Sequence, residues 1–374
     1  MKITMFGHKR IPSREGGVEI VAEELSTRMA AMGHSVTCYN RSGRHIGGVD
    51  YNTKAASVYR DVNLKTVPTI DKRGLAAVSS SFFAAVCCAF SDAEIVHIHA
   101  EGPGFMCWLP KLFCKRVVVT IYGLDWKREK WKSGFGSRYI RWGEKMAVRY
   151  ADEIIVLSEN VRRYFLDTYG RETRYIPNGV TRPMCRESAL IRETYGLEGD
   201  DYILFLGRLV PEKGVHYLID AYQRMDTEKR LVIAGSASDT DSYVKMLKET
   251  AGENKKILFT GFVQGQILEE LYSNAWVYVL PSELEGMPLS LLEAMSYGNC
   301  CLVSDIPECA EVVEDHALVF PKGDISALQE CLQRLCDDPA LTTGYKAGAA
   351  DFICGKYNWD AATEQTLKLY GEKQ

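Results

Sequence analysis

Two glutamates, Glu285 and Glu293, stand eight positions apart in a stretch that reads as strand, turn and helix. The apolar run Ala275–Leu280 is rich in residues that favour β-structure and predicts a buried strand. Pro288 stands where a helix should begin, and Gly286 before it lets backbone approach a ligand closely. Unpaired N–H groups at a helix start attract phosphate, and carboxylates on either side suit the hydroxyls of two sugars. The stretch predicts a nucleotide-sugar site, although two acids there can also serve only the helix dipole.

A second stretch supplies positive charge. The predicted strand Tyr202–Phe205 is followed by G-R-L-V-P-E-K-G, which places Arg208 and Lys213 just beyond the carboxyl end of the strand. Two cations in that position suit the clamping of a diphosphate. An arginine and a lysine in a loop are more commonly only solvated, so the loop by itself leaves both interpretations open.

Together the two stretches resemble the signatures of the retaining glycosyltransferases of family 4, which have the GT-B fold. The glutamates match the Glu-x7-Glu signature, and the cationic loop matches G-R-x-x-x-x-K-G at Gly207, Arg208, Lys213 and Gly214. The resemblance implies retaining transfer of a hexose from a nucleotide-diphosphate sugar, with a UDP-sugar favoured. The expected acceptor is a saccharide or a polyprenyl-diphosphate-linked sugar in cell-surface polysaccharide synthesis.

The resemblance also assigns roles to residues, and it implies neither a metal ion nor another cofactor. Arg208 and Lys213 would neutralise the departing diphosphate, as preorganised charges can do in place of a divalent ion. Glu285 would orient the hydroxyls of the transferred sugar, and Glu293 would hold the ribose. The further donor contacts that it implies are Gly207, Phe262, Val263, Gly286, Met287, Pro288 and Leu289.

Candidates in the first half of the chain are fewer. His99 ends the predicted strand Ile95–His99 and is a candidate catalytic residue, whereas His97 lies within the strand and is interpreted as a core residue. Gly16 and Gly17 stand at the start of the first helix. Turn geometry alone accounts for such a pair about as often as ligand contact does, and the resemblance favours ligand contact. Relatives often carry His-Gly after the next strand, where this chain has Tyr122-Gly123. That departure leaves donor choice and activity open.

Residues 126–149 differ in composition from the rest of the chain. Lysines and arginines alternate there with aromatic residues, and the only acids are Glu129 and Glu144. Such a run is usually a solvated face, but basic residues with aromatics favour an anionic membrane surface or a lipid-pyrophosphate acceptor.

Short apolar strands alternate with helical patterns along the whole chain, which predicts an α/β fold with parallel sheets. We expect two doubly wound Rossmann-like domains facing a cleft: residues 1–180 for the acceptor and 181–358 for the donor. Residues 359–374 are expected to form a helix that crosses back to the first domain. Expected helices include Val18–Met32, Val215–Met225 and Ile325–Asp337, the last with Asp324 as its N-cap.

Composition narrows the remaining possibilities. A net charge of −4 over 374 residues indicates no nucleic-acid partner. The sequence shows neither a signal peptide nor an apolar run long enough for a membrane span, and Leu75–Phe90 is interpreted as a buried helix. Twelve cysteines without a C-x2-C pair indicate a reduced, cytoplasmic protein. Peripheral association with the inner face of the plasma membrane is a further hypothesis.

The sequence leaves two rival functions open. The same fold could serve a sugar-nucleotide epimerase or a sucrose-type synthase. Alternatively, Tyr122 at the usual histidine position would suit a catalytically inactive subunit that binds nucleotide-sugar.

Overall fold

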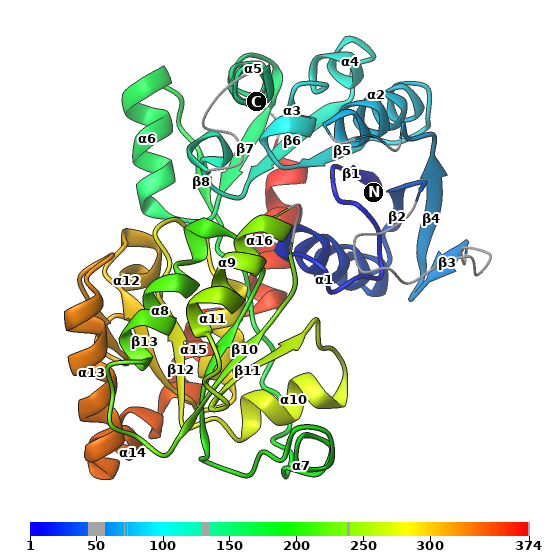
Figure 1. Cartoon of the computed structure of the whole chain (residues 1–374). Coiled ribbons are helices and arrows are strands. Elements are labelled where there is room, and N and C mark those ends of the chain that lie inside the picture. Colours follow the sequence, from blue (N-terminus) through cyan, green and yellow to red (C-terminus); the bar gives the residue numbers. More distant parts are fainter. Residues whose placement is uncertain (44–56, 71, 73, 129–134, 238–239, 373–374) are drawn as a thin grey trace. The chain divides into compact units, whose positions relative to one another are not determined.

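The computed structural model in Figure 1 describes residues 1–43, 57–70, 72, 74–128, 135–237 and 240–372. The chain divides into two compact units. Unit 1 comprises Met1–Asn178 and Trp359–Gln374, and unit 2 comprises Gly179–Asn358. Each unit is an α/β layer structure built on one sheet.

The sheet of unit 1 has the strand order β3-β4-β2-β1-β5-β6-β7-β8, and all neighbours are parallel except β3 and β4. Its central strands are apolar and buried on both faces, as expected of a parallel sheet covered by helices. The strands are β1 Lys2–Phe6, β2 Ser35–Arg41, β3 Val58–Tyr59, β4 Val62–Val67, β5 Ile95–His99, β6 Arg116–Ile121, β7 Glu153–Val156 and β8 Arg174–Tyr175.

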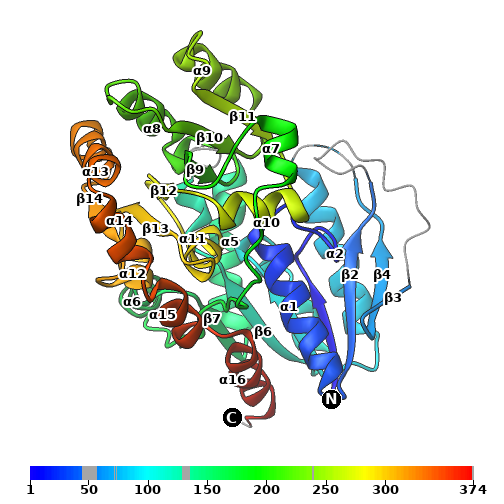
Figure 2. The same ribbon diagram turned by 90° about the horizontal axis from the view of Figure 1, so that it is seen from below.

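Helices cover both faces of this sheet. The helices are α1 Gly17–Ala31, α2 Leu75–Ala89, α3 Glu101–Gly104, α4 Trp108–Leu112, α5 Phe135–Tyr150, α6 Glu159–Tyr169 and α16 Trp359–Gly371. Figure 2 shows α1 and α16 side by side, and Arg28 of α1 donates to Asp360 of α16 at 2.7 Å. The helices α2, α3, α4 and α5 form a second layer, in which α3 and α4 each contact both α2 and α5.

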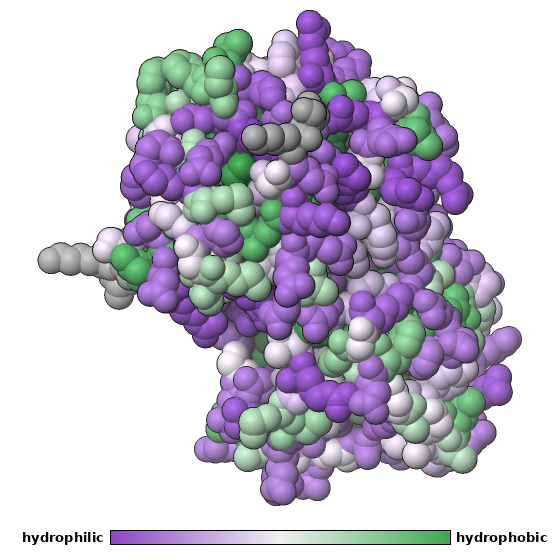
Figure 3. Space-filling model, turned by 180° about the vertical axis from the view of Figure 1, so that it is seen from behind, coloured by the Kyte–Doolittle hydropathy of each residue, from purple (hydrophilic) through white to green (hydrophobic). Residues whose placement is uncertain are grey.

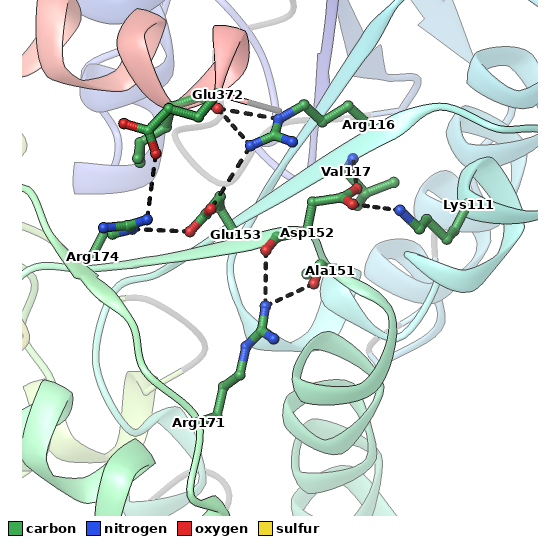
Figure 4. Close-up of polar contacts among 10 residues, drawn as sticks. Lys111, Arg116, Val117, Ala151, Asp152, Glu153, Arg171, Arg174 and Glu372 are labelled. Carbon is green, nitrogen blue, oxygen red and sulfur yellow. Dashed lines mark hydrogen bonds and ion pairs between the residues drawn. The ribbon is translucent and has the colours of Figure 1, made fainter. Parts of the chain in front are cut away.

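A polar network holds the edge of unit 1 (Figure 4). Asp152 accepts the backbone N–H of Val117 at 2.8 Å and pairs with Lys111 of α4. Arg116 donates to the carbonyl oxygen of Leu369 in α16 at 2.8 Å. These contacts join β6, β7 and α4, and they tie the last helix to the sheet.

The sheet of unit 2 is fully parallel, with the order β11-β10-β9-β12-β13-β14. Numbered from its own first strand, this order is 3-2-1-4-5-6, the dinucleotide-fold arrangement. The strands are β9 Tyr202–Leu206, β10 Arg230–Ala234, β11 Ile257–Gly261, β12 Val277–Leu280, β13 Cys300–Ser304 and β14 Leu318–Phe320.

Helices again lie on both sides of this sheet. Figure 2 shows α8, α9 and α13 on one side and α11 and α15 on the other. Asp324 caps α13 through the backbone N–H of Ala327, at 3.0 Å. The helices are α7 Leu190–Tyr195, α8 Val215–Tyr222, α9 Asp241–Ala251, α10 Gln266–Ser273, α11 Leu289–Ser296, α12 Pro307–Val313, α13 Ile325–Asp337, α14 Pro339–Lys346 and α15 Ala349–Lys356.

Most predicted elements are present, but three predictions need correction. The helix α8 ends at Tyr222 instead of Met225, and the strand β4, which lies next to the edge strand β3, was not predicted at all. The helix at Leu75–Phe90 is present as α2 but is not buried, since Phe82, Phe83 and Phe90 are exposed. In the described part of the chain, no helix is long and apolar enough to cross a membrane.

Candidate active site

The residues singled out in the second half of the chain gather at one place in unit 2. Strands β9 and β12 are neighbours, and the connections that follow them lead to opposite sides of the sheet. Ligands of open parallel sheets bind at such a switch point, beyond the carboxyl ends of the strands. The loop after β9 carries Arg208 and Lys213, and the loop after β12 carries Glu285.

Backbone contacts lock these two loops together. Glu283 N–H donates to the carbonyl oxygen of Glu212 at 2.8 Å. Gly214 has a φ of +67°, and a Cβ at this position would lie 2.0 Å from the carbonyl oxygen of Pro281. Only glycine meets both the left-handed conformation and the close approach. The loop sequence therefore fixes where Lys213 stands relative to the second loop.

Lys213 and Glu285 form a buried ion pair. Lys213 Nζ donates to Glu285 Oε1 at 2.6 Å, and the side chains are 12% and 8% exposed. Ser282 Oγ donates to the same carboxylate oxygen, also at 2.6 Å. The sequence singled out both charged residues but gave no sign that they pair. Arg208 is exposed at the end of β9.

Two buried tyrosines hold α11, the helix that carries Glu293, and sequence reasoning missed both. Tyr272 Oη donates to Glu293 Oε2 at 3.2 Å, and Tyr278 Oη donates to Ser290 Oγ at 2.9 Å. Burial raises the pKa of Tyr272 well above its usual value, with the Glu293 carboxylate adding to the shift, so the phenol keeps its proton. These bonds orient α11, on which Glu293 lies. Tyr278 lies within the predicted strand, but nothing in the spacing of these tyrosines indicated a polar role.

The remaining donor candidates lie at the same edge of the sheet of unit 2. Gly286, Met287 and Pro288 are buried in the turn before α11, and Leu289 is half-buried. Phe262 and Val263 follow β11, where Phe262 is exposed. Gly207 follows β9, and a Cβ added to this glycine would lie 3.9 Å from Lys213 Cε. In the described residues, no group of three or more acidic, histidine or cysteine side chains is arranged to hold a metal ion.

In unit 1 the candidates lie at its own switch point, between β1 and β5. His99 is fully buried, and its Nδ1 is 2.7 Å from Tyr122 Oη. His97 is also buried, between Tyr370 Oη at 2.6 Å and Thr120 Oγ1 at 2.7 Å. Burial lowers the pKa of His97 to about 3 and that of His99 well below its usual value, so both rings are neutral at pH 7.

At the start of α1, the Glu19 carboxylate lies beside Gly16, where the sequence predicted contact with a ligand. Glu19 Oε1 accepts the backbone N–H of Lys9 at 2.8 Å, and a Cβ at Gly16 would lie 2.5 Å from Glu19 Oε2. Gly16 is the N-cap of α1 and Gly17 is its first residue. Gly16 therefore has a structural use in making room for Glu19.

Comparison with known proteins places this arrangement in a family. Residues 188–351 match the model of glycosyl transferases group 1, and residues 15–182 match that of glycosyltransferase family 4. An uncharacterised glycosyltransferase of Methanocaldococcus jannaschii is 33% identical over 74% of this chain and 75% of its own length. The O-antigen chain mannosyltransferase B of Escherichia coli is 31% identical over 52% of this chain and 51% of its own length.

Solved structures show the same fold. Sucrose-phosphate synthase from Thermosynechococcus elongatus has a TM-score of 0.82 at 22% identity, covering 99% of this chain and 98% of that one. HepE of Anabaena, solved in complex with UDP and glucose, has a TM-score of 0.80 at 16% identity, covering 98% of both chains. The chain belongs to the family 4 glycosyltransferases and has the GT-B fold. It is an enzyme of the hexosyltransferase class, as the sequence predicted.

Proposed function

We propose that this enzyme transfers a hexose, with retention of configuration, from a UDP-sugar to a saccharide or lipid-linked acceptor in cell-surface polysaccharide synthesis. The observation that carries the proposal is the buried Lys213–Glu285 pair at the switch point of unit 2. The glutamate positions the lysine ammonium beyond the end of β9, where a diphosphate would lie. The UDP complex of HepE and the O-antigen role of the Escherichia coli relative support the donor and the pathway.

The proposed mechanism divides the work between four side chains. Lys213 and Arg208 stabilise the charge that develops on the departing diphosphate, so that no divalent ion is required. Glu285 orients the hydroxyls of the transferred sugar from the side of the pair, and Glu293 binds the ribose. The departing phosphate accepts the proton of the attacking hydroxyl on the same face of the sugar. We assign His99, which is buried in unit 1, to the acceptor side.

The test is transfer from UDP-hexoses to lipid-linked saccharides, with the product linkage read by NMR. An α-linked product from an α-configured donor, formed equally well after removal of divalent ions with EDTA, is the expected result. A β-linked product would overturn retention, and activity lost with EDTA and restored by Mg²⁺ would overturn metal independence.

The similarity to sucrose-phosphate synthase keeps a second candidate, transfer to a small free sugar. An epimerase or such a synthase would turn over UDP-sugar without any lipid or polysaccharide acceptor. An inactive subunit would bind UDP-sugar without turnover on any acceptor. The same reaction series, run with and without the lipid-linked acceptor, separates these outcomes.

A further inference from the structure

The outer surface of the helix layer in unit 1 has an unusual composition at its α2 and α4 end. Phe82, Phe83 and Phe90 of the α2 segment are exposed, as are Leu112 and Phe113 at the end of α4. The rings of Phe90 and Phe113 are 4.7 Å apart, which joins the two helices into one apolar patch. Figure 3 shows hydrophobic surface gathered at its upper left, where α2 and α4 lie. We call these five residues the apolar patch.

The exposed residues of α2 fall on one side of the helix. Phe82, Phe83 and Phe90 are spaced by one, seven and eight positions, which is a single helical face. The helix has no charged residue along its whole length. Soluble proteins seldom leave an aromatic helix face uncovered, and such a face marks a surface that contacts another apolar body.

The neighbouring helix α5 carries positive charge on its outer side. It packs against α3 closely enough that a Cβ at Gly143 would lie 2.0 Å from the carbonyl oxygen of Glu101. It also contacts α4, where Cys107 Sγ donates to the carbonyl oxygen of Met146 at 3.1 Å. Its exposed residues are Arg138, Arg141, Trp142, Lys145 and Arg149, which we call the cationic stripe.

Acidic residues are missing from the outer side of this layer. Along α2, α3, α4 and α5, the only acids are Glu101 and Glu144, and both are completely buried. The chain as a whole has a net charge of −4, so the cationic stripe does not follow from the overall composition. Just beyond these helices, Asp92 follows α2 and pairs with Lys2 at 2.5 Å, and Asp152 follows α5 and pairs with Lys111 of α4.

We propose that the apolar patch and the cationic stripe together dock unit 1 onto an anionic lipid surface. The stripe is drawn to the lipid headgroups while the phenylalanines and Leu112 enter the boundary of the acyl chains, as amphipathic surfaces do. A second copy of the chain fits less well, because a two-fold interface through the patch would bring two cationic stripes to the same contact. The inference deepens the proposed function, since a lipid-linked acceptor lies in such a surface.

The apolar and the electrostatic contribution differ in their response to salt, and this difference gives the test. We would measure flotation of the full chain with phosphatidylcholine vesicles that contain about one third phosphatidylglycerol, at low salt and near 1 M salt, where the Debye length is ~3 Å. Phe90→Ser/Leu112→Ser removes two strongly exposed residues, 73% and 68% exposed, and should weaken binding at least about tenfold at both salt concentrations. Arg138→Gln/Lys145→Gln should weaken it at low salt only.

Leu166→Ser, an exposed leucine of α6 outside the layer, is the matched control and should bind like the wild type. Binding of the patch variant equal to that of the control would overturn the proposal. The proposal would also be overturned if the wild type sedimented as a dimer, the patch variant sedimented as a monomer, and neither bound the vesicles. UDP affinity is measured on the same variants and should be unchanged, so a failure of the donor-site proposal would show there and not in the flotation.

Discussion

At the scale of single residues, the Lys213–Glu285 pair links stability to the proposed activity. Both side chains are nearly buried, and the lysine is the cation that balances the carboxylate. Removing one partner of a buried pair leaves the other charge uncompensated, which costs much more than the pair contributes by itself. An alanine at either position would therefore reduce activity partly by loosening unit 2, so the two effects must be measured separately.

Lys213→Met should lower the free energy of unfolding by about 3–5 kcal/mol, because Glu285 is left buried without its cation. The double variant Lys213→Met/Glu285→Gln should recover most of that loss while staying inactive. Urea unfolding of both variants gives the comparison. Lys245→Met, which removes the cation of an exposed pair with Glu249, is the control and should cost less than about 1 kcal/mol. Equal losses for Lys213→Met and Lys245→Met would contradict the buried-pair account.

At the scale of elements, α3 and α5 meet through a buried carboxyl pair. Glu101 accepts the backbone N–H of Asp125 at 2.9 Å, and Glu144 accepts the Tyr164 hydroxyl at 2.8 Å. Burial raises the pKa of Glu101 well above its usual value, and the carboxylates of Asp125 and Glu144 add to the shift. Glu101 therefore holds its proton to higher pH in the folded chain than in the unfolded chain.

The consequence is a fall in stability as pH rises above the ordinary glutamate pKa of ~4.3, because the folded state then binds more protons than the unfolded state. Glu101→Gln mimics the protonated form, so its stability should lack this fall and should exceed that of the wild type near neutral pH. Urea midpoints between about pH 5 and pH 8 provide the measurement. Parallel pH profiles of stability for the wild type and Glu101→Gln would contradict this assignment to Glu101. The control is Glu159→Gln, at a carboxylate whose side chain is 45% exposed.

The elements themselves were largely predictable, for reasons that also explain the misses. β9 and β12 are continuous apolar runs beside glycine-rich turns, and Asp324 caps α13 by the expected bond. β4 was missed because V-N-L-K-T-V has only its two end valines buried, so it lacks the apolar run of a central strand. The exposed side of α2 was missed because composition does not distinguish a buried helix from an apolar surface helix.

At the scale of the whole molecule, two sheets of the same design each place their candidate residues at a switch point. The local motifs predicted this placement, because a polar loop that follows a parallel strand lies at the carboxyl end of that strand. The pairing of Lys213 with Glu285 was not predictable, because 72 positions separate them and only the order of β9 and β12 brings them together. The basic segment predicted at 126–149 is described except for 129–134, and its helical part forms the cationic stripe.

The most direct test compares Glu285→Gln with Glu293→Gln for UDP affinity by calorimetry and for turnover of the UDP-sugar. Ribose hydroxyls do not change during the reaction, so Glu293→Gln should weaken UDP and donor together. The amide oxygen of Gln can still accept from Lys213 Nζ, so Glu285→Gln should lower turnover and leave UDP affinity nearly unchanged. A buried hydrogen bond to a charged group is worth about 1.5–3 kcal/mol, so we expect each effect to be roughly tenfold to hundredfold. Loss of UDP affinity in Glu285→Gln with none in Glu293→Gln would contradict the assignment of the site.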